Sequence, residues 1–299
     1  MRLGRIAPLG AVVLWLSGCA TPDAHWRSHV SSLPTQAPVV LLGEQHDADE
    51  HQTLARLSVA RLAQSPGLSA LLLEMADDGT DTTGLASDAT EAQVRERLRW
   101  NDAGWPWQRY GPVVMQAVQL GVLVVGANLP RSAMGGVMRD EQWDTRVPPA
   151  VLADHRERMV GSHCGLLPAS QVPGMARIQI ARDARMAQTA ERWLRPGKTV
   201  LLVAGAEHVK RDRGIPLFWS AALSEPAHVV WMRTGAPEAR LIGLNAGQVG
   251  MVGNFEHFRY FADRGNKVAT HQGKTDTAPV RTNIRLCRQT ARGGPAALG

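Results

Sequence analysis

The sequence predicts an α/β fold in which a mainly parallel sheet is flanked by helices on both faces. Short, continuously apolar runs of strand length recur along the chain, which is typical of strands that are buried on both faces. These runs alternate with segments of helical periodicity, and that alternation indicates a parallel sheet covered by helices. The chain has 299 residues, of which 44% are hydrophobic, so it can bury a substantial core.

The N-terminus has the features of a bacterial lipoprotein signal peptide, which we assign to residues 1–18. Two arginines precede an apolar stretch that is too short to span a bilayer. The stretch ends in Leu16-Ser17-Gly18-Cys19, which matches a lipobox, and acyl chains on the cysteine hold a protein on a membrane. We therefore expect lipidation at Cys19 and a folded domain outside the cytoplasm. Residue 20 is Ala rather than Asp, which by the usual sorting rule favours the outer membrane.

The polar residues 19–36 predict a lipid-anchored tether, and residues 37–263 predict the folded domain. Within that domain, five apolar runs predict buried strands. They are residues 38–43, 70–74, 122–125, 199–204 and 227–232. Helical spacing of apolar residues predicts helices at 49–64, 90–99, 112–120 and 175–194. Residues 131–194 contain no apolar run of strand type, so we expect a helical insertion or subdomain there.

Residues 264–299 are rich in Gly, Thr, Ala and Arg and lack helical or strand periodicity, which predicts a disordered basic tail. From Arg264 onward the chain has seven Lys or Arg residues and one Asp, which accounts for the whole formal net charge of +6. The rest of the chain is formally neutral. Because a folded basic face is missing, we expect no nucleic-acid partner.

The chain has three cysteines, and lipidation would use the first of them. A disulfide between Cys164 and Cys287 is permitted outside the cytoplasm, but Cys287 lies in the predicted disordered tail, which leaves the pairing open. The spacing fits no zinc motif.

Polar residues follow the ends of four predicted strands, and two of these ends have the pattern Gly-x-x-His. In an open α/β sheet, ligands bind beyond the carboxyl ends of the strands, so these residues are expected to converge on one site. Histidine and carboxylate side chains together can bind a metal or transfer protons. The alternative is that each is a helix cap or a turn residue. These residues are Glu44 and His46, Glu74, Arg131, and Glu207 and His208.

Six segments between about Ala37 and Arg233 follow one another in a characteristic order. They are Gly43–Asp47 with His51 and Gln52, Leu73–Met75, Trp105–Trp107 with Tyr110, Gly126–Arg131, His163–Gly165, and Ala204–His208. In this order they resemble the ChaN family of haem-binding lipoproteins, which belongs to a wider superfamily with Tiki, TraB and erythromycin-esterase-like proteins.

The resemblance implies a non-catalytic surface protein that binds haem, assists haem and iron uptake near an outer-membrane haem receptor, and forms a homodimer around haem. Tyrosinate or histidine suits ferric haem iron. Tyr110 lies within a matching segment, whereas Tyr260 lies outside the match, so Tyr110 is the candidate iron ligand. The candidate haem-binding residues are Glu44, His46, Glu74, Tyr110, Arg131, His163, Glu207 and His208.

Two other functions remain open. The wider superfamily includes hydrolases, so a metal-assisted or acid–base hydrolase using Glu44, His46, Glu74 and His208 is the main alternative. A third hypothesis is an interaction protein in which these residues have only a structural role. The sequence has no Gly-x-Ser-x-Gly elbow and no Gly-rich phosphate loop, which disfavours a serine hydrolase and a nucleotide enzyme.

Overall fold

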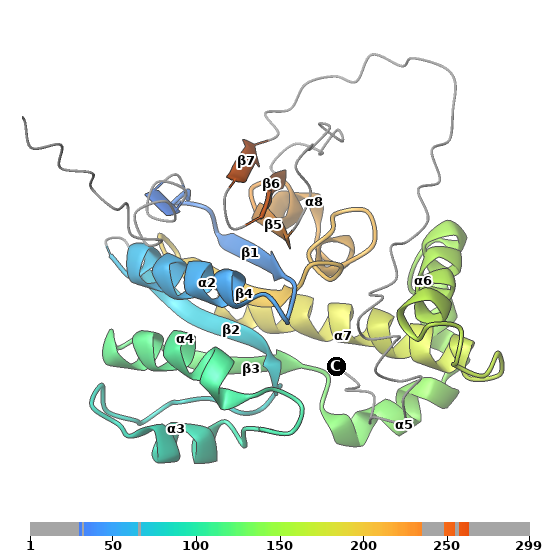
Figure 1. The fold of residues 1–299 in the computed structure, drawn as a ribbon, viewed down its shortest axis with the longest axis horizontal. Helices are drawn as coiled ribbons and strands as arrows, with labels where there is room; N and C mark the ends of the chain where they lie inside the picture. Colours follow the sequence, from blue (N-terminus) through green and yellow to red (C-terminus); the bar gives the residue numbers. More distant parts are fainter. Residues whose placement is uncertain (1–29, 32, 65–66, 235–247, 255–256, 263–299) are drawn as a thin grey trace, which may run out of the picture.

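The computed structural model of the chain describes residues 30–31, 33–64, 67–234, 248–254 and 257–262. A seven-stranded sheet runs through the molecule in the order β3-β2-β4-β1-β5-β6-β7 (Figure 1). Neighbouring strands are parallel, except that β6 and β7 are antiparallel. The strands are β1 (Val39–Glu44), β2 (Leu68–Asp77), β3 (Val124–Asn128), β4 (Thr199–Gly205), β5 (His228–Thr234), β6 (Gln248–Asn254) and β7 (His257–Ala262).

Helices pack on both faces of the sheet, so the predicted fold class is confirmed. The α-helices are α2 (Asp49–Leu62), α3 (Glu91–Arg97), α4 (Trp107–Gln119), α5 (Arg131–Arg139), α6 (Pro149–Ser162), α7 (Val172–Trp193) and α8 (Ala221–Ser224). Two 3-10 helices, η1 (Glu141–Thr145) and η2 (Ile215–Phe218), complete the described elements.

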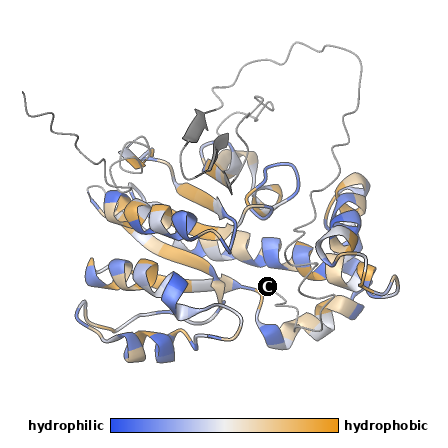
Figure 2. Ribbon diagram, viewed as in Figure 1, coloured by the Kyte–Doolittle hydropathy of each residue, from blue (hydrophilic) through white to orange (hydrophobic). Residues whose placement is uncertain are grey.

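The core has two layers, one on each face of the sheet. On one face, apolar side chains of α2 and α4, such as Val59 and Val114, pack against the strands. On the other face, α7 contributes Met186 and Ala190, and η2 contributes Ile215. The central strands β1 and β4 are buried along their whole length because both faces are covered. The strands are accordingly apolar, while the helices carry their polar residues outward (Figure 2).

The helix predicted at residues 112–120 begins earlier than expected, because α4 begins at Trp107. Pro112 lies inside the helix, and the Asp102 carboxylate accepts a hydrogen bond from the backbone N–H of Trp107 at the start of the helix. This earlier start brings Arg109 and Tyr110 onto a rigid helix.

The segment between β3 and β4 contains α5, η1, α6 and α7 and no strand. Helix α7 contacts β2, β3 and β4, whereas α5 and α6 pack against α7 beyond the sheet. Arg177 of α7 donates two hydrogen bonds of 2.9 Å to Asp144 of η1, which fixes the outer helices to α7. Cys164, in the turn after α6, is disulfide-bonded to a partner outside the described residues.

The packed part of the chain begins before Ala37, because Val30 and Leu33 are buried in the same core as α2 and α4. The predicted tether therefore overlaps the folded domain at its C-terminal end. The predicted signal peptide, Cys19, Cys287 and the basic tail lie outside the described residues. Among the helices that are described, none is both long and apolar enough to cross a membrane.

Candidate functional site

The topology brings the two Gly-x-x-His segments side by side at the carboxyl edge of the sheet. Strands β1 and β4 are parallel neighbours, and Glu44 at the end of β1 is paired with Gly205 at the end of β4. Strand β2 lies on the other side of β4 and carries Glu74 one residue beyond the Leu73–Val203 pair. Residues at or near the ends of three adjacent strands therefore meet at one place, as expected for a parallel sheet.

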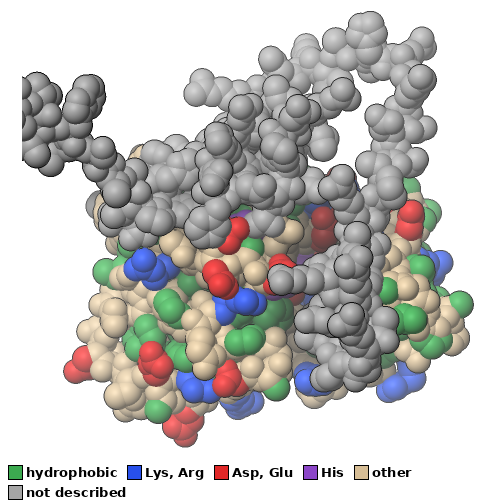
Figure 3. Space-filling model, in the orientation of Figure 1, with side chains coloured by type: hydrophobic (Ala, Val, Ile, Leu, Met, Phe, Trp, Pro, Cys, Tyr) green, Lys and Arg blue, Asp and Glu red, His purple; other side chains and the backbone are tan. Residues whose placement is uncertain are grey.

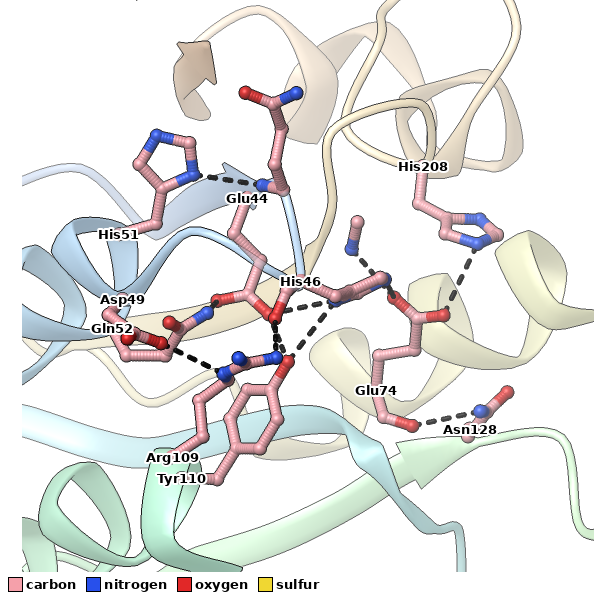
Figure 4. Close-up of polar contacts among 12 residues, drawn as sticks. Glu44, His46, Asp49, His51, Gln52, Glu74, Arg109, Tyr110, Asn128 and His208 are labelled. Carbon is pink, nitrogen blue, oxygen red and sulfur yellow. Dashed lines mark hydrogen bonds and ion pairs between the residues drawn. The ribbon is translucent and has the colours of Figure 1, made fainter. Parts of the chain in front are cut away.

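Glu44 is the centre of the first half of the site (Figure 4). Its carboxylate is 1% exposed and accepts three hydrogen bonds. Tyr110 Oη donates to Oε1 at 2.7 Å, and His46 Nδ1 lies 2.8 Å from the same oxygen. Gln52 Nε2 donates to Oε2 at 2.9 Å. Helices α2 and α4 thus hold the Glu44 carboxylate, which in turn orients the His46 ring.

Glu74 is the centre of the second half. Its Oε2 accepts a 2.6 Å hydrogen bond from the backbone N–H of Gly205. Its Oε1 lies 3.4 Å from His208 Nε2, and the other ring nitrogen of His208 lies 2.6 Å from Asp183 Oδ1 on α7. His46 Nε2 lies 3.9 Å from Glu74 Oε2, which joins the two halves into one network.

The glycines of the two Gly-x-x-His segments are required by close packing. A Cβ atom on Gly43 would lie 2.3 Å from Val209 Cγ2, in the turn after β4. A Cβ atom on Gly205 would lie 2.9 Å from His46 Nε2 and 3.5 Å from Glu74 Oε2. Both glycines therefore let the ends of β1 and β4 approach each other, and Gly205 leaves room for the His46 ring beside Glu74.

The buried charges shift one another's pKa values. Burial alone would lower the pKa of His208, but the Glu74 and Asp183 carboxylates raise it to about 10. Burial alone would raise the pKa of Glu74, yet the neighbouring His208 and His46 hold it well below its usual range. Burial opposes protonation of His46 as well, and the bond to Glu44 nevertheless raises the pKa of His46. His208 is consequently cationic and Glu74 anionic at neutral pH.

Aromatic side chains form one wall beside His46. The Trp105 ring lies edge-on to the His46 ring, with centroids 4.8 Å apart, and Trp105 packs edge-on against Tyr110 at 5.8 Å. Arg109 donates to the backbone carbonyl of His46 at 2.7 Å and pairs with Asp49 at 3.0 Å. The His46 side chain remains 35% exposed, so it is the part of the network that a ligand can reach.

A model of the family described as haem-binding uptake, Tiki superfamily, ChaN matches residues 33–218, more than half of the chain. The chain belongs to this family. The resemblance inferred from the ordered segments is therefore confirmed. The four network residues that belong to those segments lie within the matched range. They are Glu44, His46, Glu74 and His208.

Among solved structures, ChaN of Campylobacter jejuni, described by its cofacial haem binding, is 23% identical to this chain with a TM-score of 0.57. That match covers 72% of this chain and 87% of the other, and it shows a shared fold. A protein of Bacillus cereus is 13% identical, and the match covers 72% of this chain and 70% of the other with a TM-score of 0.39. No curated protein matches the chain.

Three predicted site residues of this ChaN-family protein lie apart from the network. Arg131 begins α5 with an exposed side chain, and only its backbone N–H contacts Asp77. His163 caps the end of α6 and bonds the Met159 carbonyl through Nδ1. Glu207 is half exposed and pairs with Arg158 at 2.8 Å. Position in a matching segment did not reveal which way these side chains point.

Two residues of the network were not predicted as site residues, Asp183 and Gln52. Asp183 is 1% exposed on a helix face that is otherwise buried and apolar, with Ile180 three residues before it and Ala187 four residues after it. A single carboxylate at a core position of a helix is a usable signal, because such a group needs a buried partner. Within the described residues, no group of three His, Cys, Asp or Glu side chains is arranged to hold a metal ion.

Charged side chains of both signs lie on the face that Figure 3 presents, interspersed among apolar and uncharged ones. Among the described residues, opposite charges pair locally, for example Arg109 with Asp49.

Proposed function

We propose that this protein is a haem-binding lipoprotein that assists haem uptake without catalysing a reaction. Membership of the family described as haem-binding uptake supports the haem ligand. The observation in the molecule that carries the proposal is His46. It is the exposed member of a buried polar network, and an aromatic wall flanks it.

The chemistry of His46 fits a residue that would hold haem iron. Metal-binding histidines commonly donate their second ring N–H to a carboxylate, which fixes the ring and makes the free nitrogen more basic. Glu44 provides that carboxylate at Nδ1, and no hydrogen bond occupies Nε2 among the described residues. When bound, haem would supply iron whose electronic state depends on this ligand. Trp105 offers the apolar surface that a porphyrin edge requires.

Tyr110 was the candidate iron ligand from the sequence, and its surroundings favour His46 instead. The Tyr110 side chain is 2% exposed, and its hydroxyl donates to Glu44. Burial and the Glu44 carboxylate both raise the pKa of Tyr110, which disfavours the tyrosinate that iron would need. We infer that Tyr110 positions Glu44 and that His46 contacts the iron.

Titration of hemin into the purified folded domain, followed by the Soret band, tests the proposal. The wild-type chain should bind hemin, and His46→Ala should change the Soret band and weaken binding at least about tenfold, the loss of roughly 1.4 kcal/mol. His163→Ala is the matched control, because His163 is also a partly exposed histidine but lies apart from the network. A wild-type chain that leaves the hemin spectrum unchanged would overturn the haem function.

Tyr110→Phe separates the two candidate ligands. The variant keeps the ring and removes the hydroxyl that donates to Glu44, so stability should fall by about 1–3 kcal/mol while the hemin spectrum stays the same. Urea unfolding measures the first effect and absorption spectroscopy the second. A changed spectrum with intact folding would restore Tyr110 as the ligand.

The setting in the cell forms part of the same proposal. The lipobox ending at Cys19 supports an outer-membrane lipoprotein whose folded domain lies outside the cytoplasm. There it would hand haem to, or receive haem from, an outer-membrane receptor, and a homodimer would form around the ligand. Analytical ultracentrifugation with and without hemin tests the dimer, which should form only when hemin is present.

A second candidate function is an acid–base hydrolase, and the adjacency of His46 and Glu74 favours it. His46 has a raised pKa and can donate a proton to a substrate, and the Glu74 carboxylate 3.9 Å away remains anionic beside it. A panel of ester and peptide substrates would test this function. Turnover of a substrate by the wild-type chain, abolished by Glu74→Gln, would support the hydrolase function. If the wild-type chain turns over none of the substrates, the hydrolase function is refuted and the haem proposal remains.

A further inference from the structure

His208 lies between two buried carboxylates from different elements. Asp183 Oδ1 on α7 is 2.6 Å from Nδ1, and Glu74 Oε1 on β2 is 3.4 Å from Nε2. Asp183 and Glu74 are each 1% exposed, and the His208 side chain is 12% exposed. Water therefore has little access to the three groups, and they must satisfy one another.

This geometry determines the state of the His208 ring. Neutral imidazole has one nitrogen that donates and one that accepts, whereas imidazolium donates from both. Burial raises the pKa of Asp183, and the neighbouring His208 opposes that shift. When both carboxylates are ionised, a neutral ring would place a lone pair against a buried anion. Only the cationic ring then gives each carboxylate a hydrogen-bond donor, and it leaves neither nitrogen free to bind a metal.

The helical segment between β3 and β4 also holds the turn after β4, which carries His208. Arg158 of α6 pairs with Glu207 at 2.8 Å, and Asp154 of α6 pairs with Arg213 at 2.9 Å. A Cβ atom on Gly214 would lie 2.1 Å from the His208 carbonyl oxygen, so the turn closes tightly on itself. The ring thus has little freedom to leave the two carboxylates.

We propose that Asp183 is a positioning residue of the site, which holds His208 as a fixed imidazolium that orients Glu74 toward His46. In this arrangement His208 is a cationic hydrogen-bond donor to both carboxylates and not a ligand of a metal. The inference goes beyond the proposed haem function, since it assigns a role to the helical segment and holds with or without haem.

The test is the protonation state of the His208 ring in the full chain, read from the ¹⁵N shifts of its two nitrogens by NMR. Both nitrogens should carry protons at pH 7, and the ring should titrate near the pKa of about 10. The other titratable or charged groups around this network are His46, His155 of α6 and Arg182 of α7. A neutral His208 ring in the wild-type chain at pH 7 would overturn the inference.

Two variants assign the effect to the Asp183 carboxylate. Asp183→Asn removes its charge, so the His208 titration midpoint should fall by about 1–3 pH units, whereas Asp183→Glu should restore it. Asp144→Asn is the control, because Asp144 also lies in the helical segment and pairs with a helix arginine but is remote from His208. A midpoint that Asp183→Asn leaves unchanged would contradict the positioning role.

The wild-type ¹⁵N spectrum decides the question even where Asp183→Asn fails to fold. Failure of the wild-type chain to bind hemin would refute the proposed function alone, because the His208 measurement requires no haem. Conversely, a neutral His208 together with normal hemin binding would refute only the inference about Asp183.

Discussion

At the scale of single residues, the site depends on Gly205, whose lack of a side chain leaves room for the His46 ring. Gly205→Ala would place a methyl group 2.9 Å from His46 Nε2, so the ring must move away from Glu74. We expect a loss of about 1–3 kcal/mol in stability and a clear weakening of hemin binding. Calorimetric melting and hemin titration measure the two effects.

The control for this substitution is Gly136→Ala. Gly136 lies inside α5, and a Cβ atom there meets nothing within 4 Å. Alanine should stabilise the helix by about 0.5–1 kcal/mol and leave hemin binding unchanged. Equal behaviour of the two alanine variants would show that the space beside His46 is not what Gly205 provides.

The buried His208 also makes stability depend on pH. Its pKa is about 10 in the folded chain against an ordinary 6.5, so its contribution is fully present below pH 6.5 and is lost as the pH rises toward 10. The Tm of the wild-type chain should therefore fall between pH 7 and 10, and His208→Ala should flatten that slope. Melting curves across this range measure it, and parallel slopes in the two proteins would contradict the assignment.

The residue scale also shows what sequence patterns can and cannot predict. Convergence of Glu44, His46, Glu74 and His208 followed from strand ends, because parallel strands share one carboxyl edge. Glu207 is adjacent to His208 and still turns outward to α6, since neighbouring side chains in a turn point in different directions. Asp183 is far from every strand end and reaches the site only through the packing of α7.

At the scale of elements, the strands with continuous apolar runs were predicted, and β6 and β7 at one end of the sheet were missed. Strands β1 to β5 show the expected apolar signal, including β3 at the opposite edge of the sheet. The sequences of β6 and β7, such as QVGMVGN, include polar and glycine residues that interrupt an apolar run. The prediction relied on continuous apolar runs, so it missed strands that have none.

Helix α6 and the turn after β4 act as one unit, which Arg213→Gln should weaken. Arg213 donates to both oxygens of Asp154, and its carbonyl contacts His155. Loss of about 1 kcal/mol should speed amide exchange in residues 206–214 roughly fivefold, without loss of the fold. Hydrogen-exchange mass spectrometry measures this, with Arg195→Gln as the control because Arg195 donates to the nearby carbonyls of Arg192 and Leu194. If exchange becomes faster only in other segments, α6 does not hold the turn after β4.

At the scale of the whole molecule, the proposed membrane anchor rests on one cysteine. Cys19→Ser should prevent lipidation and release the protein from the membrane fraction, because the rest of the signal stretch is too short to remain as a span. Cell fractionation with immunodetection checks the outcome, and Cys287→Ser is the control that keeps the lipobox intact. Membrane retention of the Cys19 variant would refute lipid anchoring.

The strand order has a consequence for how the chain can fold. Strand β1 is the first strand made, yet its two neighbours, β4 and β5, begin at Thr199 and His228, about 160 and about 190 residues after Val39. The N-terminal third therefore has no partner for β1 until most of the chain has been made. Pairing over such sequence distances is slow, so the apolar face of β1 stays exposed to aggregation during that interval.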